Sequence, residues 1–236
     1  RGFRAPQAFN EDLHISSVGG EQRFVILSEN LETEFSNAFT ASLDYTKDFN
    51  FVQTNLLVEG FYTSLENPFT IVSTGTSLPN GSILEESRNG SGAYVAGANI
   101  ELSVVPNPSL AFQAGVTIQE AVFRDDQVLF EADGSVENET DVIIDEFVRT
   151  PNVYGFLTSY WKINQAFKLD FTGNFTGPMV APRVVGESGF IDLVDTESFF
   201  DLTAKLSYAF DIKGLFKAEL NGGIQNLFDS YQDEFD

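Results

Sequence analysis

The chain has 236 residues and a formal net charge of −22 at pH 7, from 35 acidic and 13 basic residues, which argues against a nucleic-acid-binding face. Cysteine is absent, so the sequence excludes a disulfide, a thiolate metal site and a cysteine nucleophile. Hydrophobic residues make up 42%, too many for a disordered chain, yet no run approaches the ~20 apolar residues of a membrane helix.

Alternating apolar and polar residues recur along the chain and predict strands with one dry and one wet face. In chain order the predicted strands are 38–45, 51–62, 94–104, 110–119, 153–163, 167–176, 199–212 and 216–225, with less regular alternation in 51–62 and 153–163. In 199–212 the apolar set is Phe200, Leu202, Ala204, Leu206, Tyr208 and Phe210, and the intervening residues are mostly polar. Strands in soluble sheets average about 5 or 6 residues, whereas a tilted strand that spans a bilayer needs roughly 9 to 11. The longer alternating stretches therefore favour membrane strands.

The connections between these strands alternate in length. Hairpin-sized turns rich in Asn, Pro, Asp and Gly follow the first strand of each pair, and long connections follow the second, at roughly 64–92, 125–150 and 177–196. This asymmetry is typical of outer-membrane barrels. The aromatic residues near strand ends fit two interfacial girdles: Phe51, Tyr62, Tyr94, Tyr160, Trp161, Phe167, Phe175, Phe200 and Phe210. The sequence predicts an all-β, antiparallel transmembrane barrel segment, and a soluble β-sandwich binding module is the alternative.

Four segments resemble TonB-dependent outer-membrane receptors, in the order that this family has them. GFRAPQAFNEDLHI (2–15) resembles the Gly-Phe/Tyr-Arg-Ala-Pro segment of their barrels, and VEGFYTSLENPF (58–69) resembles a second-hairpin strand. LSENLETEFSNAF (27–39) resembles a Leu-x-Pro-Glu…Glu-x-Gly stretch, with Ser28 and Asn37 in place of the usual Pro and Gly. GGIQNLFDSYQDEFD (222–236) resembles the Asn-Leu-Phe-Asp…Tyr segment before the final strand. The segments are most similar to receptors of the Bacteroidota.

The resemblance implies that residues 1–236 are the C-terminal part of a barrel of about 22 strands, roughly strands 14 to 21, without the plug and the final strand. A complete eight-stranded barrel is the rival within this architecture. The implied activity is TonB-energised import of a scarce nutrient, such as a ferric siderophore, cobalamin or another metal–organic complex, rather than catalysis. A passive porin or small structural barrel is the alternative function.

The implied partners are the TonB complex, reached through the plug, outer-membrane lipid and lipopolysaccharide, a surface lipoprotein, and a small-molecule or metal-complex substrate, with no nucleic acid. Polar residues on the wet face would line the lumen and hold the plug: Asn99, Glu101, Gln113, Gln119, Asp170, Asn174, Asp201, Lys205, Glu219, Asn221 and Gln225. Ligand residues are expected in the loops, with Arg4, Glu11, Asp12 and His14 as the candidates.

The seven arginines all map to the long-loop end, where they would meet an anionic ligand or lipopolysaccharide phosphates, or simply pair with loop acids. The loop 125–146 has nine acids and no base up to residue 146, which fits a solvated loop better than a divalent-cation site, because its spacing departs from the EF-hand pattern. No cofactor is expected otherwise. No G-x-S-x-G elbow or P-loop occurs, and a Ser–His pair using the single histidine, His14, has no serine singled out by spacing.

Overall fold

The computed structural model describes residues 1–6, 23–77, 79, 83–130, 140–185, 190–212, 214 and 216–232. Every regular secondary-structure element in these parts of the chain is a β-strand. Among the same residues, we find no helix with the length and hydropathy needed to cross a membrane.

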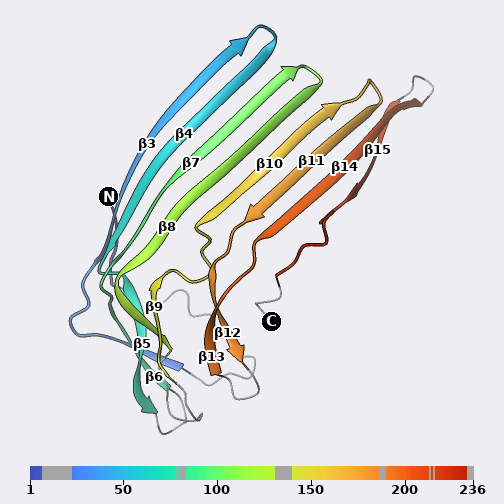
Figure 1. Ribbon diagram of the computed structural model, residues 1–236. Coiled ribbons are helices and arrows are strands. Elements are labelled where there is room, and N and C mark those ends of the chain that lie inside the picture. The colour runs from blue at the N-terminus through green and yellow to red at the C-terminus, as the bar shows by residue number, and fades with distance from the viewer. Residues whose placement is uncertain are drawn as a thin grey trace.

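One large antiparallel sheet forms the body of the molecule (Figure 1). Its strands lie in the order β1-β3-β4-β7-β8-β10-β11-β14-β15, and β9 pairs with the last part of β8. Their bounds are β1 (Gly2–Arg4), β3 (Glu34–Phe49), β4 (Val52–Glu66), β7 (Ala93–Asn107), β8 (Leu110–Phe130), β9 (Val142–Glu146), β10 (Val153–Lys162), β11 (Phe167–Thr176), β14 (Phe199–Ile212) and β15 (Phe216–Ile224). The eight long strands are the eight that the alternation predicts, so the fold class is confirmed.

Several strands are longer than their alternating cores. β3 begins at Glu34, four residues before the predicted start, and β8 continues to Phe130, well past the predicted end at residue 119. The extension of β8 contains Arg124, Asp125 and Asp126 in succession, which leaves no dry face there. Alternation therefore marks the part of a strand that has an apolar side, and not its full hydrogen-bonded length.

The short turns gather at one end of the sheet and the long connections at the other (Figure 1). Polar side chains shape the turns. Asn164 Oδ1 accepts hydrogen bonds from the backbone N–H groups of Ala166 and Phe167, at 2.8 and 2.9 Å. Asp211 Oδ1 accepts one from Gly214, whose φ of 69° suits glycine.

The long connections contain strands of their own, which the sequence did not predict. β2 (Arg23–Leu27), β6 (Ile83–Asn89) and β5 (Phe69–Ser77) form a three-stranded sheet in which β2 runs parallel to β6. β12 (Val180–Val185) and β13 (Phe190–Asp195) form a separate hairpin. These strands are short and follow no long alternating pattern, so the period-two signal that predicted the eight long strands is missing from them.

The register places apolar residues of neighbouring strands opposite one another. One row across β3, β4, β7, β8, β10, β11 and β14 consists of Leu43, Val58, Ile100, Val116, Gly155, Phe175 and Phe200. The intervening polar residues form the opposite face in the same way. The sheet thus has one continuous apolar face and one continuous polar face.

The apolar face is exposed, and no protein core covers it. Among the described residues the buried apolar side chains are Ala93, Ala121, Val142, Ile144 and Ala181. On the apolar face, by contrast, Leu43 is 66% exposed and Leu220 is 64% exposed. A β-sandwich buries one face of each sheet against the other, and no second sheet packs on this face in the described residues. The face is built for contact with lipid, as in a transmembrane barrel.

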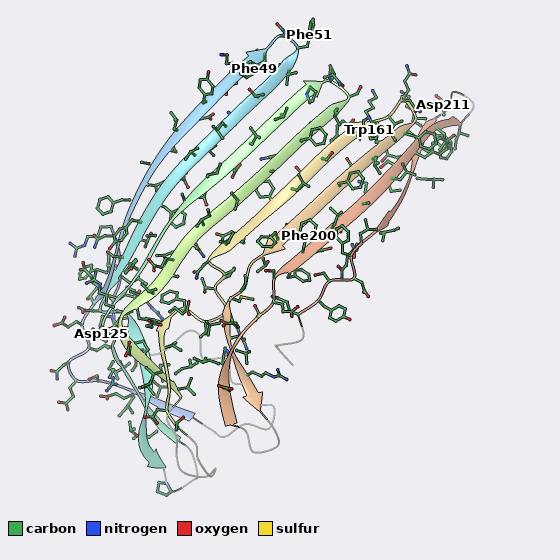
Figure 2. The ribbon with its side chains drawn as sticks, viewed as in Figure 1. Phe49, Phe51, Asp125, Trp161, Phe200 and Asp211 are labelled. Atoms are coloured by element: carbon green, nitrogen blue, oxygen red, sulfur yellow. The ribbon has the colours of Figure 1, made fainter. Side chains whose placement is uncertain are left out.

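Aromatic side chains mark both ends of the apolar face. Phe49, Phe51 and Trp161 lie at the short-turn end in Figure 2, whereas Asp125 lies toward the long connections. Ten residues separate Phe39 from Phe49 in β3 and Phe200 from Phe210 in β14. At about 3.3 Å per residue and a tilt of about 40°, each stretch spans roughly 25 Å, the height of the apolar band in outer-membrane barrels. The girdle prediction was wrong for Tyr160, which the register places on the polar face opposite Ala111 and Asp170.

Candidate functional site

The polar face of the main sheet is the candidate functional surface, because it collects the polar side chains of eight strands on one wall. Ten of the eleven residues predicted to line the lumen project from this face, and Gln225 follows the end of β15. The ten are Asn99, Glu101, Gln113, Gln119, Asp170, Asn174, Asp201, Lys205, Glu219 and Asn221. The alternation alone therefore predicted correctly that these ten residues share one face of the sheet.

On β4 and β7, the carboxylates of Glu59 and Glu101 accept hydrogen bonds from neutral amide side chains. Asn99 Nδ2 donates to Glu59 Oε1 at 3.0 Å, and Asn99 Oδ1 accepts from Thr117 Oγ1 at 2.8 Å. Gln113 Nε2 donates to Glu101 Oε2 at 3.5 Å. This chain of contacts crosses from β4 to β8 and fixes the side chains of the wall. Glu59 and Thr117 were not predicted, although their positions in the alternation would have placed them on the polar face.

Ion pairs replace neutral contacts on β11, β14 and β15. Lys205 Nζ lies 3.8 Å from Asp170 Oδ2, and Lys168 Nζ lies 3.5 Å from Glu219 Oε2. Both pairs are substantially exposed, with side-chain exposures between 32% and 52%. Pairs of this kind contribute about 0–1 kcal/mol each. Their main effect is to leave this part of the wall close to neutral.

Two aromatic rings lie close to glycines of the polar face. The ring of Phe61 covers Gly97, and the ring of Phe156 covers Gly115, so closely that a Cβ atom at either glycine would clash. Such rings fill the space above a glycine that has no side chain. They explain the irregular alternation of 51–62 and 153–163, because Phe61 and Phe156 stand at positions where the pattern expects polar residues.

At the long-connection end, Arg4 is the predicted ligand residue that the structure describes. It lies in β1 directly opposite Glu34 of β3, and its guanidinium carbon stands 5.3 Å from the centre of the Phe69 ring. Glu11, Asp12 and His14 lie outside the described residues. Of the four predicted ligand residues, the structure therefore describes the position of Arg4 alone.

Asn89, at the end of β6, joins two of the long connections by hydrogen bonds and was not predicted as a functional residue. Its Oδ1 accepts from the backbone N–H of Glu32 at 2.7 Å, and its Nδ2 donates to the carbonyls of Glu32 and Asn67 at 2.9 and 2.8 Å. Asn67 Nδ2 in turn donates to Glu32 Oε2 at 2.9 Å. We call these three residues the Asn89 knot. It joins the three-stranded sheet to the long strands.

A second cluster of hydrogen bonds, which we call the Asn226 knot, joins Asn226, Ser230 and Asp201 after the end of β15. Asn226 Nδ2 donates to the carbonyl of Ser230 at 2.7 Å, and Ser230 N–H donates back to Asn226 Oδ1 at 2.9 Å. Asn226 N–H also donates to Asp201 Oδ1 at 3.1 Å. Gln232 then donates to Thr196 Oγ1 at 3.3 Å and to the carbonyl of Glu197, which docks the segment beside the β12–β13 hairpin.

The remaining charge predictions concern the long-connection end. Five of the arginines there lie in β1, β2, β6, β8 and β12, Arg1 directly precedes β1, and Arg149 lies in a turn beside β9 (Figure 1). Part of the acidic loop, residues 131–139, lies outside the described residues. Elsewhere, within the described ranges, no three His, Asp or Glu side chains are grouped in a way that could hold a metal ion.

Comparison with known proteins gives a consistent family. A family model described as "TonB dependent receptor-like, beta-barrel" matches residues 1–227. No match was found among curated proteins. Among solved structures, the siderophore receptor PirA from Pseudomonas aeruginosa is similar, with a TM-score of 0.59 and 14% identity over 90% of this chain and 30% of that one.

Two further solved structures show the same fold. The FrpB iron transporter from Neisseria meningitidis has a TM-score of 0.56 at 10% identity, over 90% of this chain and 30% of that one. The copper transporter OprC has a TM-score of 0.53 at 12% identity, over 87% of this chain and 27% of that one. The chain therefore spans about a third or less of the length of these proteins.

Proposed function

Because the chain belongs to the TonB-dependent receptor-like β-barrel family of the outer membrane, we propose that it is part of an active importer of a scarce nutrient. The observation that carries the proposal is the family match over residues 1–227. The main sheet agrees with it, because one of its faces is apolar and exposed and the other is polar. In this proposal residues 1–236 are the C-terminal portion of a larger barrel.

The polar face would line the lumen and contact a plug domain. Polar groups of this face such as Asn174 are exposed and make no side-chain hydrogen bond within the described part of the chain, and they would need partners once a plug covered them. A plug would supply those partners. TonB, energised from the inner membrane, would pull on the plug and open a path along the wall.

The cargo we propose is a ferric siderophore, cobalamin or another metal–organic complex. The similar solved structures include a siderophore receptor, an iron transporter and a copper transporter, which supports a metal-related cargo for this chain. Arg4, with Glu11, Asp12 and His14, would contact the ligand at the long-connection end. Arginine there suits carboxylate or phosphate groups because its planar fork forms two hydrogen bonds at once.

The further partners in this proposal are outer-membrane lipid, lipopolysaccharide and a surface lipoprotein. The segments quoted from the sequence support a source among the Bacteroidota. A divalent cation at the acidic loop 125–146 remains the weaker alternative to a solvated loop, and the proposal assigns the protein no catalytic reaction.

A passive porin is the competing function, and energy dependence separates the two. In the native bacterium, deletion of the gene should reduce uptake of radiolabelled ferric siderophores or cobalamin, and deletion of TonB should reduce it equally. Restoring the gene should restore uptake only when TonB is present. Uptake that needs this gene but persists unchanged without TonB would contradict the importer and favour the porin.

A further inference from the structure

Polar and charged side chains interrupt the apolar face where it meets the long connections. Register places Tyr94 of β7 and Glu120 of β8 on this face, and Ser64 of β4 lies directly opposite Tyr94. Arg124 continues the alternation of Glu120 toward the long connections, just before Asp125, which Figure 2 labels. We call Ser64, Tyr94, Glu120 and Arg124 the rim cluster.

Arg124 is an exposed cation that has no hydrogen-bond or ion-pair partner among the described residues. Its side chain lies against Gly92, with Cδ 3.3 Å and Nε 3.5 Å from the point that a Cβ atom of Gly92 would occupy. The guanidinium is therefore positioned at the border of the apolar face with its donors free. A planar guanidinium in such a position can bind a phosphate group with two hydrogen bonds at once.

Below Arg124, toward the middle of the membrane, the rim cluster offers acceptors. Tyr94 OH donates to Glu120 Oε2 at 3.3 Å, and the Tyr94 ring stacks on the Tyr62 ring with centroids 6.0 Å apart. The other oxygen of Glu120 accepts no hydrogen bond from a described residue, and Ser64, which is 6% exposed, is a buried hydroxyl without a described partner. Such groups need hydrogen-bond partners, so this level suits a ligand that supplies N–H or O–H groups.

Still deeper, small side chains form a dent in the apolar face. Ala41, Gly60 and Ala98 are paired in one row across β3, β4 and β7, whereas the next row toward the membrane centre has larger Leu, Val and Ile side chains. A Cβ atom at Gly60 would meet no atom within 4 Å, so the space above it is open. Ala96 opens the dent toward the rim cluster, and Phe39, which is 69% exposed, borders it. The dent has room for one acyl chain.

From these three levels we infer that the rim cluster and the dent bind a phosphorylated saccharolipid with amide-linked hydroxyacyl chains, the chemistry of the lipid A part of lipopolysaccharide. Its phosphate lies at Arg124, its amide N–H and hydroxyl groups at Glu120, and one acyl chain over Gly60. Arg124 and Glu120 are four residues apart, or about 13 Å along the strand. Their side chains therefore contact different groups of one headgroup.

Glu120 distinguishes this lipid from a glycerophospholipid. The ester groups that link the chains of a glycerophospholipid are acceptors only, so a carboxylate placed below the phosphate would face no donor. In the saccharolipid, amide and hydroxyl donors lie below the phosphate, at the level of Glu120. The inference deepens the lipopolysaccharide contact of the proposed function and rests on it in one respect, because it takes the long connections to lie outside the cell.

The test uses the full-length receptor, delipidated in detergent, and native mass spectrometry with bisphosphorylated lipid A as the probe. The wild type should form a saturable adduct. Arg124→Gln and Glu120→Leu should each weaken it about tenfold, because each removes hydrogen bonds to a charged group. Gly60→Leu should also weaken it, because the new side chain fills the dent.

Gly222→Leu is the matched control, since Gly222 lies on the apolar face of β15 and a Cβ there also meets no atom within 4 Å. It should bind lipid A as the wild type does. Each variant is compared after it migrates as a heat-modifiable barrel. Dioleoyl phosphatidic acid, which has a phosphate but only ester-linked chains, should bind the wild type more weakly, and Glu120→Leu should not weaken it further.

No saturable lipid A adduct on the wild type, equal loss in Gly222→Leu, or equal binding of the two lipids would overturn the inference. The comparison of the two lipids on the wild type needs no variant to fold. If lipid A fails to bind while uptake remains TonB-dependent, only this inference falls. TonB-independent uptake with lipid A binding intact removes the importer and leaves the lipid site.

Discussion

Leu206 and Lys205 are neighbours in β14 that meet opposite surroundings. Leu206 is 45% exposed on the apolar face, between Leu169 and Gly222 of the adjacent strands, whereas Lys205 pairs with Asp170 on the polar face. A cation on the lipid face near the middle of the bilayer costs ~2–4 kcal/mol. Loss of an exposed ion pair costs about 0–1 kcal/mol.

We therefore expect Leu206→Arg in the full-length receptor to reduce the folded, heat-modifiable fraction in outer membranes strongly. Lys205→Leu should leave that fraction nearly unchanged. Gel mobility with and without heating measures both. Equal effects of the two substitutions would show that the facing of β14 is assigned wrongly.

Gly115 and Gly60 give a matched pair of glycines in neighbouring parts of the sheet. A Cβ at Gly115 would meet the ring of Phe156, whereas a Cβ at Gly60 would meet no atom within 4 Å. Overpacking of this kind costs about 1–3 kcal/mol. Gly115→Ala should thus lower the urea midpoint of the receptor in lipid vesicles, and Gly60→Ala should not.

Adding Phe156→Ala to Gly115→Ala tests the cause. Removal of the ring relieves the clash, so the double variant should lose less stability than the sum of the two single variants. Additive losses would mean that the ring is not what excludes a side chain at Gly115.

The sequence predicted the polar wall because strand periodicity decides the facing of Glu101, Asp170 or Lys205 without knowledge of their partners. It did not predict the contacts. The pairing of Lys168 with Glu219, which reaches across β14, depends on register between strands, and the alternation of one strand contains no information on register. The rings over Gly97 and Gly115 were missed for the same reason.

At the scale of elements, the Asn89 knot holds the three-stranded sheet in place. Asn89→Ala would remove three hydrogen bonds and leave backbone groups of Glu32 and Asn67 without those partners. Such losses lower local stability by about 1–3 kcal/mol. Amide hydrogen exchange of residues 30–34 and 67–70 should accelerate by ~10-fold or more, with Gln53→Ala as the control at the far end of β4. Unchanged exchange would show that packing alone fixes the sheet.

In the Asn226 knot, substitutions of Asn226 can distinguish the effect of its backbone conformation from the effect of its side-chain hydrogen bonds. Asn226 has a φ of 48°, which glycine adopts freely and alanine does not. Asn226→Gly loses only the side-chain hydrogen bonds, whereas Asn226→Ala also adds strain of about 1–2 kcal/mol. We expect the alanine variant to have the lower urea midpoint, and equal midpoints would contradict a role for the left-handed backbone.

The eight long strands could be predicted because a dry face about ten residues long leaves a strong period-two signal. β5, β6, β12 and β13 could not, because they are short and lie where long alternation is absent. Pairing of β2 with β6 joins residues far apart in the chain, and no local pattern in either strand specifies that partner.

At the scale of the whole molecule, the described sheet has two open edges. β15 has no neighbour on one side, and β3 is covered on one side only by the three residues of β1. Unpaired edges and an uncovered apolar face promote association. Residues 1–236 produced alone in detergent should therefore form mixed oligomers in light-scattering chromatography. A monodisperse, heat-modifiable monomer would contradict this and support a small closed barrel.

The register of the main sheet also limits how such a chain can change in length during evolution. Its shifts in pairing fall between Val104 and Asn107, near a turn, and beyond Val122 in β8, so the lipid-facing band itself has an unbroken ladder. Insertion of one residue within the band would exchange the two faces of everything after it in that strand. Related sequences should therefore differ there by substitution or by paired insertions, and should concentrate single insertions and deletions in the connections beyond the two girdles.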